Sequence, residues 1–108
     1  MKKTTERTTE KQIEEHLRDR IKKRGGIAPK LTTPGTSGIP DRLVIVGGSI
    51  YLVELKKPTG RLSPVQKTLH KKIRSTGNPV YILWSYEDVD DFVDHIDDKN
   101  YIKKFDTP

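Results

Sequence analysis

The sequence predicts a single α/β domain in which one mixed β-sheet is flanked by helices, and three observations support this fold class. Capping signals open three segments with apolar residues at helical spacing, at Thr9, Ser63 and Ser85. Two apolar runs, residues 43–46 and 50–55, flank the Gly47-Gly48 pair, which suits a two-residue hairpin turn. A further apolar run at residues 80–84 follows the second predicted helix. This order of elements is typical of a sheet covered by helices.

The first predicted helix starts with a capping box, Thr9-x-x-Gln12, and ends at Gly25-Gly26. Its apolar stripe is narrow, with one apolar residue in every four: Ile13, Leu17 and Ile21. Glu10 and Glu14 lie at the edge of this stripe. On helix physics alone, either glutamate is an acid of the first turns that the helix dipole favours.

Residues 27–31 are predicted to form a short strand, which Pro29 restricts to a sheet edge. The following loop, residues 32–38, lacks the Gly-Lys-Ser/Thr ending of a phosphate-binding P-loop, so we expect no nucleotide cofactor.

Charged residues stand at one end of both hairpin strands. Asp41 comes just before the first strand, and Glu54 and Lys56 share one face at the end of the second. A hairpin at Gly47-Gly48 folds Asp41 back toward Glu54. Two carboxylates begin a Mg²⁺ or Mn²⁺ site, and a neighbouring lysine suits phosphodiester hydrolysis. The alternative is a solvated ion pair and a turn aspartate.

The second helix is predicted from Ser63-Pro64-Val65-Gln66, with serine as N-cap and proline at the first helical position. The expected inward stripe consists of Val65, Leu69 and Ile73. Gln66 has two interpretations, either the closing residue of a capping box or an amide directed at the charged site.

The last predicted helix begins at Ser85 and turns its apolar residues inward. Its aspartates are expected to form a solvated face directed away from nucleic acid: Asp90, Asp91, Asp94, Asp97 and Asp98. The three histidines, His16, His70 and His95, form no paired-ligand pattern. Ile102 and Phe105 in the tail are expected to dock on the domain or on a second subunit.

The length of 108 residues predicts one domain, with residues 1–8 as a mobile basic arm and residues 9–108 as the folded part. The absence of cysteine excludes disulfides and cysteine zinc sites. No apolar run is long enough for a membrane span, and the N-terminus lacks a signal-peptide segment, so we expect a cytoplasmic protein. The low apolar content predicts a small core and favours a homodimer.

Charge is segregated along the chain. Residues 1–74 contain 18 Lys and Arg against 7 Asp and Glu, whereas residues 75–108 contain 3 against 8. A positive surface around a carboxylate site fits a polyanionic substrate. The alternative is a basic protein whose lysines only keep it dissolved.

Together these residues resemble the VRR-NUC family of the PD-(D/E)XK nuclease superfamily. Pro40-Asp41, then Glu54-x-Lys56, match the superfamily signature, and the family resemblance extends to Gly38-Ile39 and to Gly60-x-x-Ser63-Pro64-x-Gln66. The resemblance covers roughly residues 9–85. It implies a PD-(D/E)XK (restriction-endonuclease-like) core, a phage or bacterial host, and products with 5′-phosphate ends.

The resemblance also implies roles for the site residues. Asp41, Glu54 and the main-chain carbonyl of Leu55 are the expected ligands of Mg²⁺ or Mn²⁺, and Lys56 the residue that positions water or stabilises charge. A glutamate at the start of the first helix completes the acidic site, for which Glu10 fits best and Glu14 is the reserve. Gln66 is expected to support the site.

The resulting hypothesis is a metal-dependent DNA endonuclease. Because so short a chain has no second domain to read sequence, selectivity is expected from DNA shape. A symmetric homodimer would suit a four-way (Holliday) junction, and similar stand-alone nucleases include junction resolvases. Two alternatives stay open, a non-catalytic nucleic-acid-binding module and, more weakly supported, a metal-dependent phosphoesterase for small substrates.

Overall fold

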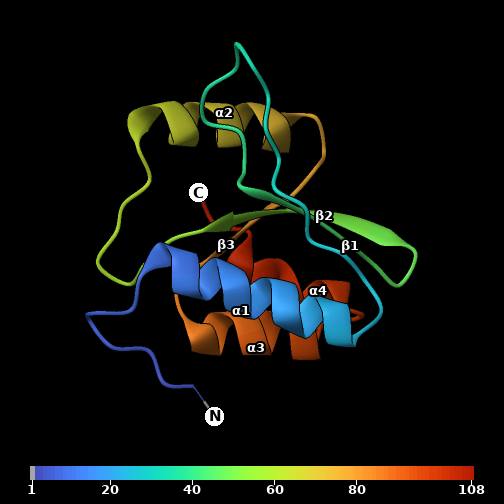
Figure 1. Cartoon of the computed structure of the whole chain (residues 1–108). Helices are drawn as coiled ribbons and strands as arrows, with labels where there is room; N and C mark the ends of the chain where they lie inside the picture. Colours follow the sequence, from blue (N-terminus) through green and yellow to red (C-terminus); the bar gives the residue numbers. More distant parts are fainter. Residues whose placement is uncertain (1) are drawn as a thin grey trace.

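The computed structural model describes residues 2–108 and contains one mixed sheet with the strand order β1-β2-β3 (Figure 1). Strand β1 is antiparallel to β2, and β2 is parallel to β3. The predicted α/β fold class is therefore confirmed. The elements are α1 (Glu10–Lys23), β1 (Arg42–Val46), β2 (Ser49–Leu55), α2 (Pro64–Ser75), β3 (Val80–Leu83), α3 (Tyr86–Asp94), α4 (Lys99–Ile102) and the 3-10 helix η1 (Lys103–Phe105).

The β1–β2 hairpin has the turn that its glycines predict. Gly47 and Gly48 have φ values of 60° and 78°, the left-handed conformations that a type I′ turn requires. The turn sets the register, in which Val46 pairs with Ser49 and Arg42 pairs with Val53. One step further along the same register, Asp41 comes opposite Glu54. The local turn chemistry thus brings two acidic residues to one end of the sheet.

The predicted edge strand at residues 27–31 is reduced to two isolated bridges, from Ile27 to Ile45 and from Lys30 to Arg42. Pro29 lies between them and has no N–H to continue a ladder, although its carbonyl accepts from Leu43 N at 3.0 Å.

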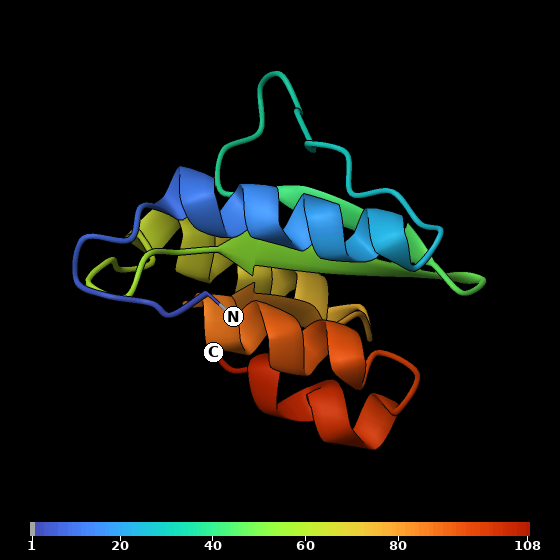
Figure 2. The ribbon, with the colours of Figure 1, turned by 60° about the horizontal axis from the view of Figure 1, so that its bottom comes forward.

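The hydrophobic core lies on the face of the sheet that α1 and α3 cover (Figures 1 and 2). The three stripe residues predicted for α1 are fully buried there: Ile13, Leu17 and Ile21. The sheet contributes alternating residues to the same core, among them Val44, Tyr51, Val53, Leu55, Tyr81 and Leu83.

The solvated aspartate face predicted for this segment is present in part: Asp94, Asp97 and Asp98 are exposed, whereas Asp90 and Asp91 are half-buried, and several of these acids also form ion pairs. Asp90 accepts from Arg20 at 2.5 Å and lies 2.7 Å from His16 Nε2, and Asp94 also pairs with Arg20. After α3, Asp97 pairs with Arg24 at 3.3 Å. These acids therefore tie α3 to α1, because the two helices pack side by side and bring opposite charges together.

Helix α2 covers the other face of the sheet, and its packing differs from the prediction. Val65 is 52% exposed, and Leu69 and Ile73 are only half-buried. The one fully buried side chain of α2 is His70. The sheet face beneath α2 carries Glu54 next to buried apolar residues such as Val80 and Ile82, and the helix places His70 against Glu54.

Both chain ends contact the domain. Ile102 and Phe105 are buried in its core, so the tail docks on its own domain. Near the other end, Tyr86 N donates to Thr4 Oγ1 at 2.7 Å. The mobility of residues 1–8 stays a prediction. Within residues 2–108, none of the helices combines the length and apolar character needed to cross a membrane.

Candidate active site

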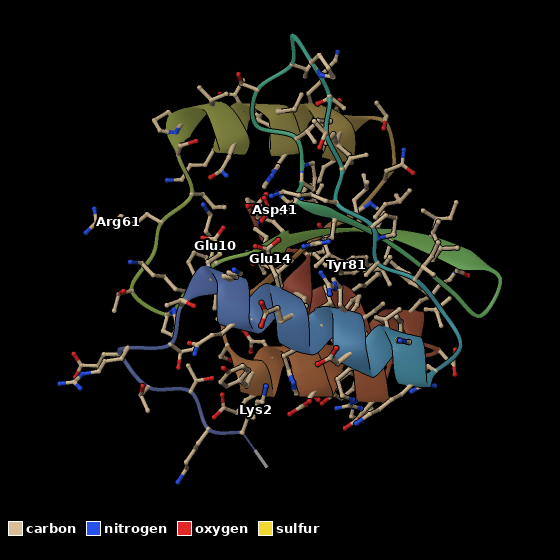
Figure 3. The ribbon with its side chains drawn as sticks, in the orientation of Figure 1. Lys2, Glu10, Glu14, Asp41, Arg61 and Tyr81 are labelled. Carbon is tan, nitrogen blue, oxygen red and sulfur yellow. The ribbon has the colours of Figure 1, made fainter. Side chains whose placement is uncertain are left out.

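Three carboxylates meet at the end of the sheet where α1 and α2 approach β2. Glu10 comes from the first turn of α1, Asp41 from the residue before β1, and Glu54 from β2; each offers one oxygen, and these oxygens lie within 4.8 Å of one another. Figure 3 shows Glu10 and Asp41 close together between α1 and α2, whereas Arg61 points outward from the loop before α2. The convergence of Asp41 and Glu54 expected from the hairpin is therefore present.

Asp41 is held by the backbone of the strand beside it. Leu55 N donates to Asp41 Oδ2 at 3.0 Å. Since the N–H and C=O of one strand residue point to the same side, the Leu55 carbonyl leaves β2 on the side of Asp41. This direction agrees with the carbonyl's expected place in the ligand set.

Position 38 requires glycine for a structural reason. Gly38 has a φ of 85°, and a Cβ there would lie 2.7 Å from the main-chain oxygen of Val65. Only glycine allows the loop to pass this close to α2. The approach fixes the path of the chain into Asp41.

Glu54 is fully buried, which is unusual for a charged residue. Its Oε2 accepts from Gln66 Nε2 at 3.3 Å and lies 3.9 Å from Lys56 Nζ, whereas Oε1 has no hydrogen-bond partner. Burial is the largest cause that raises the pKa of Glu54 to about 9, followed by the proximity of the Asp41 carboxylate. In the absence of a cation, these surroundings therefore favour the protonated form of this carboxyl group.

Gln66 makes both of the contacts that the sequence suggested as alternatives. Its Oε1 accepts from Ser63 N at 2.9 Å and closes the capping box of α2. Its Nε2 donates to Glu54. The two ends of one amide therefore connect the start of α2 to the carboxylate on β2.

The two glutamates of α1 are in different surroundings. Glu10 lies in the acidic cluster, where burial first and then the charge of Asp41 raise its pKa against the lowering effect of Lys56. Glu14 instead accepts from Arg42 at 3.1 Å, and both side chains of this ion pair are mostly buried. Geometry thus favours Glu10 over the reserve residue Glu14 as the third carboxylate.

Sequence reasoning missed His70. This residue is fully buried on α2, and its Nε2 lies 3.5 Å from Glu54 Oε1. Burial is the main cause that lowers the pKa of the His70 imidazole. The available signal was its position four residues after Gln66, on the same side of the helix.

The donor set fits a hard divalent cation. Carboxylate and carbonyl oxygens are the ligands that Mg²⁺ and Mn²⁺ take from proteins. A buried carboxylate with one unpartnered oxygen and two acidic neighbours is costly without a positive charge between them. The residues present therefore suit a metal centre.

Known proteins resemble this chain in sequence and in fold. No family model matches the sequence. The chain is 40% identical over 79 residues to "Putative nuclease p44" of Acyrthosiphon pisum secondary endosymbiont phage 1, which covers 72% of this chain and 85% of the relative. A solved structure described as "VRR_NUC domain" superposes with a TM-score of 0.73 and 32% identity, covering 82% of this chain and 98% of that one.

The chain belongs to the VRR-NUC family of nucleases. The match to the solved VRR-NUC domain includes nearly all of that domain, so the mixed three-stranded sheet with its helices is the family fold. Two members of the acidic cluster, Asp41 and Glu54, are among the residues that resemble the family signature, and Glu10 joins them from α1.

Proposed function

We propose that this VRR-NUC nuclease is a divalent-metal-dependent endonuclease that hydrolyses phosphodiester bonds in DNA. The observation that carries the proposal is the cluster of Glu10, Asp41 and Glu54, whose oxygens come within 4.8 Å of one another around a fully buried carboxylate. Asp41, Glu54 and the Leu55 carbonyl would hold Mg²⁺ or Mn²⁺, and Glu10 is placed to complete the set of ligands. When bound, such a cation supplies Lewis acidity and lowers the pKa of bound water.

Two other residues act beside the ligands. Lys56 has a side chain that is only 13% exposed, and its ammonium lies 3.9 Å from Glu54 Oε2. From there it orients the attacking water or stabilises the negative charge that develops on the oxygens of the pentacovalent phosphate. Gln66 fixes Glu54 through its amide hydrogen bond.

The distribution of exposed cations supports a polyanionic substrate. Several basic residues of the first 74 are used in ion pairs, namely Arg20, Arg24, Arg42 and Arg74. Others close to the site in the chain are exposed: Lys57, Arg61, Lys67 and Lys71. These side chains lie in the loop after β2 and on α2, where they offer contacts to a phosphate backbone.

We further propose a homodimer that cuts branched DNA such as a four-way junction, because two symmetric sites suit paired cuts. An apolar row supports pairing of two chains. Ile27 pairs with Ile45, and Ile45 pairs with Ile50, so the three side chains lie on one face of the sheet. Ile27 and Ile50 are 59% and 65% exposed, and the turn end of the β1–β2 hairpin extends beyond α2 (Figure 1).

The proposal is tested by incubating end-labelled four-way junction and matched linear duplex with wild type and Glu54→Gln, in Mg²⁺, Mn²⁺ or EDTA. We expect symmetric cuts in the junction, 5′-phosphate ends, and no cutting in EDTA or by the variant. Equal cutting of both substrates would keep the nuclease and reject the junction preference. Metal-independent binding without cutting would indicate a nucleic-acid-binding module, and a monomer in light scattering would reject paired cutting.

Glu10→Gln and Glu14→Gln are expected to separate catalysis from stability. Glu10→Gln should lower cleavage by roughly two orders of magnitude, the scale of a lost electrostatic contribution at an active site. Glu14→Gln weakens the ion pair with Arg42 and should cost about 1–3 kcal/mol of unfolding free energy with cleavage retained. Cleavage rates and urea unfolding of both variants check this; an inactive, stably folded Glu14→Gln beside an active Glu10→Gln would reverse the assignment.

A further inference from the structure

We propose that His70 is a positioning residue for Glu54, and that its Nε2–H donates to Glu54 Oε1 when the cation site is filled. The inference rests on the proposed metal-dependent function and adds to it a residue outside the family signature. His70 would not ligate the cation. It would fix the direction in which Glu54 presents its remaining lone pairs.

Unpaired buried atoms point to this contact. Within residues 2–108, three buried side-chain atoms have no hydrogen-bond partner, and they are Glu54 Oε1 and both ring nitrogens of His70. The two residues are fully buried, and Nε2 lies 3.5 Å from Oε1. This separation exceeds an ordinary N–H···O distance by about half an ångström. Active-site hydrogen bonds are often long before the complex forms, and a small movement here would satisfy two unpaired atoms together.

The position of His70 on α2 allows one helix to contact both oxygens of Glu54. Gln66 donates to Glu54 Oε2, and His70 is placed one helical turn later beside Oε1. One helix therefore offers one donor to each oxygen of the carboxylate. Each oxygen has a second lone pair, and these are left for the side on which Asp41 and Glu10 converge. Such outer hydrogen bonds orient metal ligands and commonly affect metal affinity.

The packing of α2 is consistent with this role. Its apolar residues are exposed or half-buried, and the only fully buried side chain that it places against the sheet is the imidazole. The imidazole carries two polar nitrogens into this buried position, and within the described residues Glu54 Oε1 lies 3.5 Å from one of them.

The test compares His70→Asn with His70→Gln by Mn²⁺ binding, followed as loss of the free-ion signal in electron paramagnetic resonance. The glutamine amide can take the place of Nε2, whereas the shorter asparagine cannot. We expect Mn²⁺ affinity to fall roughly 10–100-fold in His70→Asn and to stay close to wild type in His70→Gln. Thr68→Ala, an exposed change on the same helix, is the matched control.

A second readout needs no variant and decides the matter if His70→Asn fails to fold. In the Mg²⁺-loaded wild type, nitrogen NMR should show the Nε2–H tautomer of His70 with a proton protected from exchange. An Nδ1–H tautomer, or wild-type affinity in a folded His70→Asn, overturns the inference while the metal site stands. Wild type and Glu54→Gln that bind Mn²⁺ equally weakly would instead overturn the proposed metal chemistry.

Discussion

Glu54→Gln is expected to stabilise the metal-free protein, by a margin that grows as the pH rises. Burial raises the pKa of Glu54 from 4.5 to about 9, with Asp41 as the next cause. Between those values the folded protein keeps a proton that the unfolded chain has released, so rising pH favours unfolding. The limiting slope is about 1.4 kcal/mol per pH unit. Glutamine has no proton to lose at this position and removes that slope.

The measurement is urea unfolding in EDTA at about pH 5, 7 and 9, with the free energy of unfolding of Glu54→Gln compared with wild type. Glu15→Gln, an exposed change on α1, controls for the loss of one carboxylate. Added Mn²⁺ should restore the stability of wild type at high pH and leave Glu54→Gln unchanged, because the cation replaces the proton as the partner of the carboxylate. Parallel pH curves for the two proteins would contradict the raised pKa.

The convergence of Asp41 and Glu54 could be predicted because it depends on local chemistry. Gly47-Gly48 selects the turn, the turn sets the register, and the register places the two acids opposite each other. The capping boxes at Thr9 and Ser63 were predictable for the same reason, since each involves residues only three positions apart. Elements defined by short-range contacts were therefore recovered from the sequence.

Features that depend on packing between elements were not recovered. The aspartates of α3 have the composition of a solvated face, and only the position of α1 beside them reveals their pairing with Arg20. The prediction for the inward face of α2 was wrong. An apolar stripe that includes Val65 suggests burial of that side, whereas the helix buries the neighbouring side, on which His70 lies beside Glu54. His70 belongs to no paired-ligand pattern, and its closeness to Glu54 depends on how α2 packs on β2.

The place of Glu10 in the site was predictable only in part. Periodicity places it at the border of the apolar stripe but does not distinguish it from Glu14. The resemblance to VRR-NUC nucleases favoured Glu10, and the structure adds a physical reason, since Arg42 already occupies Glu14. The distinction depends on a contact between α1 and β1 that no local pattern encodes.

Lys56→Ala is expected to remove most cleavage while metal binding stays intact. The ammonium lies 3.9 Å from Glu54 Oε2 and its side chain is 13% exposed, so it is held at the edge of the acidic cluster. A positive charge there stabilises charge that develops only during the reaction, and loss of one such group typically lowers kcat by roughly 10²–10³-fold. The same charge opposes a bound cation, so its removal should leave Mn²⁺ affinity unchanged or higher.

Single-turnover cleavage and Mn²⁺ titration of the same preparations separate these two effects, with Lys57→Ala as the matched control. Lys57 is the exposed neighbour of Lys56, and its positive charge also lowers the pKa of Glu10. Its variant therefore reports the effect of losing one positive charge near the site. A small loss in Lys57→Ala beside a large loss in Lys56→Ala assigns the effect to the position of the ammonium. If both variants lose cleavage equally and in proportion to DNA affinity, Lys56 attracts substrate and has no part in the chemical step.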